Sequence, residues 1–212
     1  MRRWRCWAHG IVRSNASYAP KVAVALIHHP VVDKNGSAIT AAVTALDLHD
    51  IARAARTYGV APFYVVTPLA DQQALVTEIL DHWVHGVGAQ YNPDRKTALA
   101  VIRTMPSLAA AFADMVQDHG VPPLTVATSA QMAASDLTCG DLRALAQGER
   151  PLLLLFGTAW GLAAEVLAQT DHRLAPITGT GDYNHLSVRS AVSIILDRIL
   201  GNLQPGGETV RV

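Results

Sequence analysis

The most constraining feature of the sequence is a run of five large apolar residues, Leu152–Phe156, which ends abruptly at the loop 157–161, Gly-Thr-Ala-Trp-Gly. A short run without any polar residue is typical of a strand that is buried on both faces, as in the middle of a parallel sheet. Small residues after such a strand let backbone N–H and C=O groups approach a flat ligand. The sequence therefore predicts a central strand with a candidate nucleotide-binding loop at its end.

Other short apolar runs alternate with segments in which apolar residues recur at helical spacing. The runs predict strands at residues 22–27, 62–67, 101–102, 124–128, 152–156 and 173–177. The spaced segments predict helices that begin at Asp47, after Pro68, at Pro106, at Asp141 and at Asn184. Residues 33–36 predict the turn of a loop or small hairpin, and residues 90–96 predict a turn or linker. The alternation predicts an α/β fold, with a mostly parallel sheet and helices on both faces.

The composition predicts a soluble protein with one sizeable core, because 50% of the 212 residues are hydrophobic and only 16% are charged. We expect a single domain at residues 21–201, a flexible basic extension at residues 1–20 and a tail at residues 202–212. The last helix carries charged residues, so no segment predicts a membrane span. Cys6 and Cys139 fit neither a disulfide framework nor a zinc site, which is consistent with a cytoplasmic location.

Three common chemistries lack their signatures in this sequence. A P-loop needs Lys and Ser or Thr directly after its glycines, and neither loop 157–161 nor loop 179–181 has that pair. A dinucleotide fold needs a glycine-rich loop with a third glycine after its first strand. Here the glycine loop lies near the end of the chain and position 184 is Asn, so a nicotinamide-dependent enzyme is only a third alternative. His82 and His85 could share one helix face, but no clear third ligand accompanies them, and we expect no metal site.

Both ends of the domain carry motifs that resemble a known family. Residues 152–162, the Ala-Pro-Ile segment 175–177 with its following glycine loop, and residues 184–191 are similar to the C-terminal signature of the SPOUT superfamily. Its members are trefoil-knotted, S-adenosylmethionine-dependent RNA methyltransferases. Residues 46–60 resemble the N-terminal motif of the superfamily, in which a helix bearing an arginine runs into a Gly-Val pair. The similarity covers nearly all of residues 22–201 and is closest to a small bacterial branch described as RNA methyltransferases of the tRNA guanine-N1 type.

The resemblance implies where a cofactor and an RNA would bind. The backbone around Thr128, Gly157 and residues 177–186 is expected to surround S-adenosylmethionine in a bent conformation, and Arg53 corresponds to an arginine near the target nucleotide. The expected cofactor-binding residues are Thr128, Phe156, Gly157, Thr158, Gly161, Ile177, Gly179, Gly181, Asn184, His185, Leu186 and Ser187. The resemblance also implies a C-terminal trefoil knot and a homodimer whose active site draws on both subunits.

Two departures from the family pattern leave the target atom open. Ala159 and Trp160 stand where some branches carry a Gly-x-Glu motif, so a role for that glutamate does not transfer. Residues 184–188, Asn-His-Leu-Ser-Val, replace the common Ser-Leu-Asn-Val entry to the last helix.

Several of these side chains have alternative structural roles. Methyl transfer to a ring nitrogen or a ribose hydroxyl needs a base, and Asp182 is our candidate, although it could equally cap the last helix. Arg53 could pair with Asp50, one helical turn away, instead of contacting RNA. Asn184 and Ser187 could likewise cap the last helix without meeting a ligand.

The last loop and the last helix add two further predictions. Gly179 and Gly181 are expected to allow a backbone path that larger residues cannot follow. The apolar stripe of the final helix extends to Ile194 and Leu200, beyond the face that one core contact needs. A second buried surface on this helix, as in a dimer, is a reasonable hypothesis.

The leading hypothesis is an S-adenosylmethionine-dependent methyltransferase that acts on structured RNA, either tRNA or rRNA. The alternative is a catalytically inert nucleotide- or RNA-binding module with the same fold. A formal net charge of zero is unusual for a protein that binds RNA phosphates. Local basic patches would have to supply the attraction, and the candidates for them are Arg53, Arg56, Arg95 and Lys96.

Overall fold

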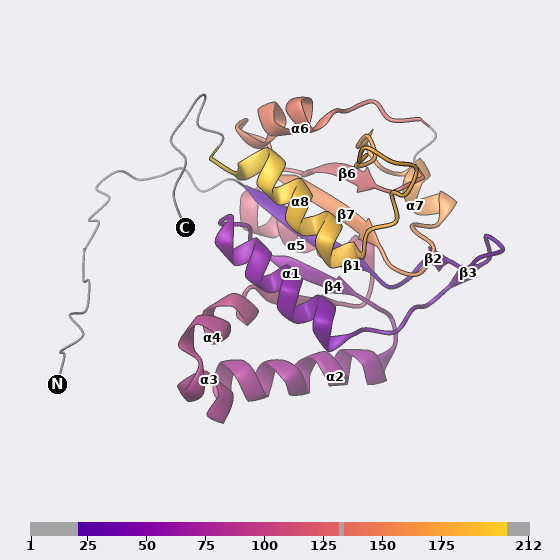
Figure 1. Cartoon of the computed structure of the whole chain (residues 1–212). Coiled ribbons are helices and arrows are strands. Elements are labelled where there is room, and N and C mark those ends of the chain that lie inside the picture. The colour runs from indigo at the N-terminus through magenta and orange to yellow at the C-terminus, as the bar shows by residue number, and fades with distance from the viewer. Residues whose placement is uncertain (1–20, 132–133, 203–212) are drawn as a thin grey trace.

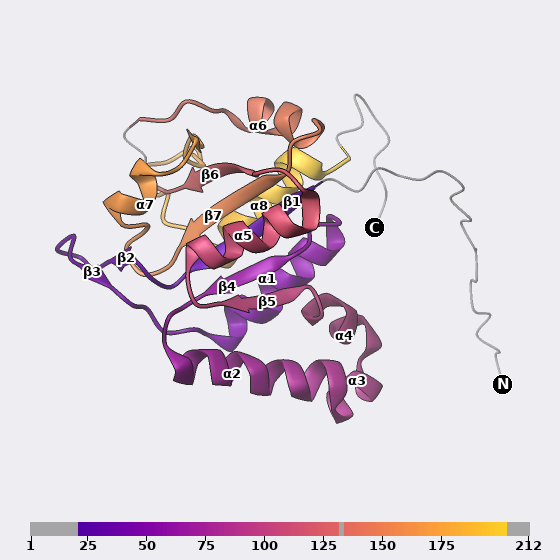
Figure 2. The same cartoon turned by 180° about the vertical axis from the view of Figure 1, so that it is seen from behind.

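The computed structural model describes residues 21–131 and 134–202. The predicted extension at residues 1–20 and the predicted tail beyond residue 202 lie outside the described residues. Within the described part of the chain, parallel strands form one sheet in the order β5-β4-β1-β7-β6-β8, with helices on both faces (Figures 1 and 2). The strands are β1 Val22–Ile27, β4 Phe63–Val66, β5 Ile102–Met105, β6 Leu124–Thr128, β7 Leu152–Gly157 and β8 His172–Arg173. The predicted α/β class and parallel sheet are confirmed.

Helices cover the two faces of the sheet unequally. They are α1 Ala45–Thr57, α2 Ala70–Leu80, α3 Val87–Tyr91, α4 Pro93–Leu99, α5 Leu108–His119, α6 Cys139–Ala146, α7 Ala164–Ala168 and α8 Val188–Leu200, with a π-helical turn, η1, at Asp81–His85. Figure 1 shows α1, α6 and α8 in front of the sheet, and Figure 2 shows α5 on the opposite face. No helix among the described residues has both the length and the apolar character to cross a membrane.

The apolar run at residues 152–156 is the centre of the core, as predicted. β7 pairs with β1 on one side and β6 on the other, and Leu152–Phe156 are all buried. Leu154 and Phe156 pack in the cluster that includes α1 and α8, whereas Leu153 and Leu155 pack in the cluster that includes α5 and α7. An uninterrupted apolar sequence is required here because both faces of the strand are covered.

A small hairpin precedes α1. Its strands are β2 Val31–Val32 and β3 Ala38–Ile39, and its turn is the predicted segment 33–36. The Asp33 carboxylate accepts the backbone N–H groups of Asn35 and Ser37, which explains why this short turn is stable. The hairpin alternative is therefore confirmed.

The end of the domain differs from the prediction in two places. The predicted strand 173–177 is only two residues long, because the backbone N–H of Ala175 bonds to Leu137 and residues 175–177 leave the sheet. The predicted helix from Asn184 begins at Val188 instead. Ser187 is its N-cap and accepts a hydrogen bond from the backbone N–H of Ser190 at 3.3 Å.

Two further predictions were wrong for reasons of capping. Residues 90–96, predicted as a turn or linker, contribute to α3 and α4, because the Asn92 side chain accepts a hydrogen bond from the N–H of Arg95 and starts α4. The first helix begins at Ala45 and not at Asp47. Its N-cap is Thr44, whose hydroxyl accepts a hydrogen bond from the N–H of Asp47.

Candidate functional site

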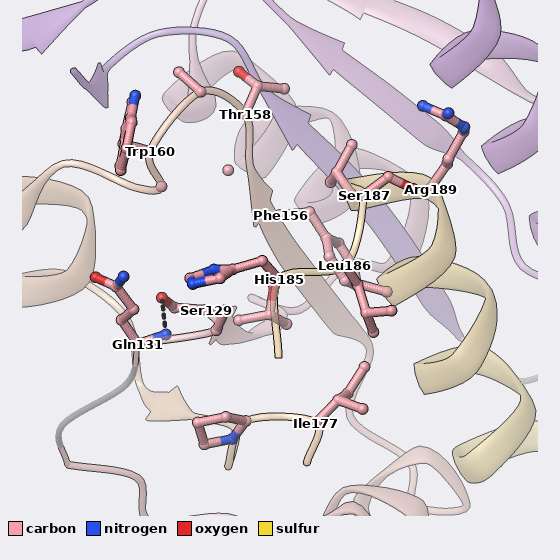
Figure 3. A pocket seen from close by; sticks show the side chains of 18 of the residues that line it. Ser129, Gln131, Phe156, Thr158, Trp160, Ile177, His185, Leu186, Ser187 and Arg189 are labelled. Carbon is pink, nitrogen blue, oxygen red and sulfur yellow. Dashed lines mark hydrogen bonds between the residues drawn. The ribbon is translucent and has the colours of Figure 1, made fainter. Parts of the chain in front are cut away.

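A cavity of about 650 Å³ lies at the carboxyl ends of β6, β7 and β8. It is lined by residues from the segment before and at the start of α1, by residues 128–131 after β6, by residues 156–161 at the end of β7, and by residues of the chain between β8 and α8. Figure 3 shows the side chains that line it. Ligands of open α/β sheets bind at this edge, because the loops that follow parallel strands gather there.

Most of the predicted cofactor-binding residues surround this one cavity. Those that line it are Thr128, Phe156, Gly157, Thr158, Gly161, Ile177, Asn184, His185, Leu186 and Ser187. The structure therefore brings the loop 157–161 together with residues 174–177 and with the segment directly before α8, whereas the glycine loop 179–181 does not contribute to the cavity. Gly179, Gly181 and Asp182 are exposed and do not line the cavity. The alternative role of Asp182 as the cap of the last helix is wrong, because Ser187 is that cap.

The constrained glycines are not those that the sequence indicated. Neither Gly179 nor Gly181 has a positive φ, and an added Cβ would meet no atom within 4 Å at either position. The prediction that these two glycines allow a backbone path closed to larger residues is therefore wrong. In contrast, a Cβ on Gly157 would lie 2.6 Å from the backbone nitrogen of Leu162. Gly161 has a φ of +116°, a conformation that favours glycine. The tight backbone lies in the loop after β7.

Several polar groups at the cavity already have partners within the protein. The Thr128 hydroxyl donates to the carbonyl of Leu155 at 3.0 Å. The side-chain amide of Asn184 donates to the carbonyl of Ala130 at 2.8 Å and thus joins the two loops that follow β6 and β8. These side chains fix the shape of the cavity.

An ion pair that the sequence analysis did not identify also lines the cavity. Asp47 is only 8% exposed, and its carboxylate accepts the Thr44 hydroxyl at 2.6 Å and Arg189 Nη1 at 3.2 Å. Arg189 Nε lies 3.3 Å from the carboxylate of Asp50. The alternative pairing of Asp50 with Arg53 is therefore wrong. Asp47 and Arg189 lie 142 residues apart in the sequence, and no local motif connects them.

Arg53 lies outside this cavity. It is exposed on α1 and lines a neighbouring groove between α1 and α8, together with Tyr58 and Ile194. Arg189 borders both the cavity and the groove. The predicted catalytic arginine is thus adjacent to the cavity of its own chain but does not line it.

His28, at the end of β1, is fully buried close to the cavity wall. Its backbone carbonyl accepts the N–H of Ala41, which lines the cavity, and its two ring nitrogens lack hydrogen-bond partners. Burial lowers the pKa of His28, and the negative charge of Asp47 opposes this effect only in part. A neutral imidazole is therefore favoured at this position.

Among the described residues, no group of three or more His, Cys, Asp or Glu side chains could hold a metal ion. His82 and His85 both lie on the π-helical turn η1, where the ring of His82 packs against Trp83.

Comparison with known proteins gives a consistent result. A family described as SAM-dependent RNA methyltransferase matches residues 21–201. A protein of Oleidesulfovibrio alaskensis named tRNA (guanine-N(1)-)-methyltransferase is 44% identical over 178 residues, which cover 84% of this chain and 41% of that protein. An uncharacterized protein of Aquifex aeolicus is 37% identical, over 84% of this chain and 87% of its own length. The chain thus spans about two fifths of the length of the first relative and most of the second.

A similar fold occurs in a solved methyltransferase structure. The SpoU methyltransferase AviRb from Streptomyces viridochromogenes, in complex with the cofactor AdoMet, has a TM-score of 0.50 at 18% identity. The match covers 84% of this chain and 56% of AviRb. At this identity the likeness concerns the fold.

Proposed function

The chain belongs to the family of S-adenosylmethionine-dependent RNA methyltransferases, in agreement with the resemblance to the SPOUT superfamily, and we propose that its cavity binds S-adenosylmethionine for methyl transfer to RNA. The observation that carries this proposal is the gathering of ten predicted cofactor-binding residues around one cavity, from segments far apart in the sequence. The alternative of a catalytically inert module is not favoured by the family match.

The residues around the cavity suit the shape and charge of this cofactor. Phe156, Ile177 and Leu186 provide apolar surface for a flat adenine ring. Asp47 and Arg189 provide opposite charges, which suit the positive sulfonium and the amino acid group. The cofactor supplies an electrophilic methyl group on its sulfonium sulfur. Transfer of that group in line to a nucleophile depends mainly on alignment, which the loops at residues 157–161 and 128–131 would provide.

The roles proposed for the remaining residues follow from their positions. Arg53, in the groove beside the cavity, would hold the target nucleotide, because a guanidinium suits bidentate binding of phosphate. Asp182 stays a prediction as the base, and it is exposed beside the cavity without lining it. Asp47 is the carboxylate that lines the cavity, and its charge would face the positive end of the cofactor.

The proposed substrate is a structured RNA, with tRNA as the first candidate. Support comes from the name of the Oleidesulfovibrio alaskensis relative, a tRNA methyltransferase of which this chain spans about two fifths. A tRNA substrate would place the enzyme in the cytoplasm. The guanine-N1 target belongs to the name of that longer protein, and the target atom here is left open.

We also propose that the domain carries a trefoil knot near its C-terminus. Hydrogen bonds to both ends of the loop after β6 support this proposal. The N–H of Leu174 donates to Ala127 at 2.9 Å, and the N–H of Ala175 donates to Leu137 at 2.8 Å. The chain that leads to α8 thus lies between the two ends of that loop, as a threaded segment would.

A homodimer is proposed on the face formed by α1 and α8. The groove on this face holds Arg53 and the half-buried Ile194, which supports a second buried surface there. An Arg53 that lies outside its own cavity would be placed to reach the cavity of a partner subunit. Light scattering at micromolar concentration should give twice the mass of the chain, and a monomeric mass would contradict the proposed dimer.

Calorimetry with S-adenosylmethionine and its demethylated product, S-adenosylhomocysteine, tests the cofactor. We expect the dimer to bind both, and absence of binding to both would reject the proposed enzyme. Methyl-labelled cofactor with total RNA then tests turnover. Binding without label transfer to RNA would favour the inert module.

A further inference from the structure

Trp160 lines the cavity and is nevertheless 67% exposed. Tyr183 is 78% exposed and Leu186 is 44% exposed, and both lie on the segment before α8 that forms another wall of the cavity. Single exposed apolar side chains are common on protein surfaces, but exposed apolar side chains at the walls of a pocket indicate a binding surface. Figure 3 shows Trp160 and His185 on the side of the pocket away from α8.

The backbone that carries Trp160 is held in place by two hydrogen bonds to Val32 of β2. Its N–H donates to the carbonyl of Val32 at 3.1 Å, and the N–H of Val32 donates to Gly161 at 3.0 Å. Ala159 has a φ of +51°, which is unfavourable for a residue with a side chain. Such a conformation persists only where the surrounding structure enforces it, and it is found most often at functional sites. The turn therefore presents a large aromatic side chain to solvent from a fixed backbone position.

An exposed aromatic ring on a fixed backbone at the mouth of a methyl-donor pocket has a specific use. A nucleotide must leave its neighbours in the RNA before its acceptor atom can reach the methyl group, and this unstacking costs free energy. Stacking on an aromatic side chain restores part of that free energy for any base. Because the backbone of Trp160 is already held by the turn, no entropy is lost in ordering the loop when a base stacks on the ring.

On these grounds we propose that Trp160 is the stacking surface for the target nucleotide of the RNA substrate. This inference rests on the proposed function and adds a base-binding subsite to it. Gln131, Ser129 and His185 lie on the same side of the cavity as Trp160 (Figure 3) and offer hydrogen-bonding groups to the edge of the stacked base.

Two other binding partners of the Trp160 ring would give different results. If the ring stacked on the adenine of the cofactor, its loss would weaken S-adenosylhomocysteine binding. If the ring packed against a second copy of the chain, its loss would change the mass in solution. A base-stacking role requires neither effect.

The experiment compares Trp160→Ala, Trp160→Phe and the wild type, with Tyr91→Ala as a matched control. Tyr91 is an 88% exposed aromatic residue on α3 that does not line the cavity. The probes are total RNA with methyl-labelled S-adenosylmethionine, S-adenosylhomocysteine in calorimetry, and light scattering. Trp160→Ala is expected to raise KM for RNA by about tenfold or more, and Trp160→Phe should recover most of the loss.

The inference predicts an unchanged affinity for S-adenosylhomocysteine and an unchanged mass in every variant. An unchanged KM for RNA in Trp160→Ala would overturn it, as would a parallel loss of cofactor affinity or a change in mass. An equal rise in KM in Tyr91→Ala would also overturn it, because general aromatic contact would then explain the effect. Failure of the wild type to bind the cofactor or to transfer label would reject the proposed function itself.

Discussion

The guanidinium of Arg189 lies 3.2 Å from the carboxylate of Asp47, and this pair joins the first turn of α8 to the first turn of α1 beside the cavity. An arginine near the N-terminus of a helix is unfavourable for the helix dipole. Its position is explained by the two carboxylates of α1, Asp47 and Asp50, that face it. The pair holds α1 and α8 together at the site where both contribute to the cavity.

Arg189→Met is expected to lower the free energy of unfolding by about 1–2 kcal/mol, because it leaves the nearly buried Asp47 carboxylate without its charged partner. Arg198→Met, in the last turn of the same helix, is the control and should change the free energy by about 0.5 kcal/mol or less. Urea denaturation measures both. Adding Asp47→Asn to Arg189→Met should recover part of the loss, and equal stability of Arg189→Met and the wild type would contradict this account.

Gly157 and Gly179 form a matched pair for the shape of the cavity loops. Gly157→Ala should cost about 1–3 kcal/mol of unfolding free energy, because the new Cβ would press on the backbone at Leu162. Gly179→Ala meets no atom within 4 Å and should leave stability within about 0.5 kcal/mol of the wild type. Chemical denaturation tests the pair, and a larger loss in Gly179→Ala would show that the wrong loop has been identified as tight.

The sequence predicts the fold well where burial alone decides the structure. The run at residues 152–156 contains no polar residue and had to become a doubly covered strand, and it is β7 at the centre of the sheet. The length of β8 could not be predicted in the same way. The length of β8 depends on the loop after β6. The carbonyl of Leu137 in this loop accepts a hydrogen bond from the N–H of Ala175, and the chain leaves the sheet at that point.

Within the candidate site, the sequence predicts which segments meet but not what each side chain does. Strand ends and small residues indicated a binding loop at residues 157–161, and the resemblance to the SPOUT superfamily implied the other residues around the cavity, since both signals rest on local sequence. The pairing of Asp47 with Arg189 depends on tertiary structure and has no local signal. Glycine marks conformational freedom and close approach, but only the structure shows that Gly161 has a positive φ, that Gly157 has no room for a Cβ, and that neither holds for Gly179.

His28 gives the fold a dependence on pH. Its pKa is lowered by burial from the ordinary value of 6.5, so the unfolded chain binds more protons than the folded chain between the lowered pKa and 6.5. Stability therefore rises with pH through that window and falls when the pH drops below about 6.5. His28→Leu removes this contribution.

Urea denaturation at pH 7.5 and pH 5.5 measures the effect of His28. The wild type should lose more stability than His28→Leu between these two values. A smaller decrease should persist in the variant, because burial also lowers the pKa of His49. Identical losses in the two proteins would exclude His28 as a source of the pH dependence.

Arg53 tests whether the groove between α1 and α8 takes part in methyl transfer. Arg53→Ala should lower kcat/KM for total RNA by about tenfold to a hundredfold, the effect of a lost charge-assisted hydrogen bond of ~1.5–3 kcal/mol. Affinity for S-adenosylhomocysteine should stay the same, because Arg53 does not line the cavity. Arg53→Lys keeps the charge but loses the planar fork and should recover only part of the rate.

The control for Arg53 is Arg56→Ala, an exposed arginine one turn along α1 that does not line the groove. Its loss removes the same charge from the same helix, so it corrects for any general attraction between the helix and RNA phosphates. We expect Arg56→Ala to lower kcat/KM by less than about threefold, in line with a single exposed charge. If both variants lose activity equally, the contribution of Arg53 is long-range electrostatic attraction. If Arg53→Ala keeps full activity, Arg53 has no part in the reaction.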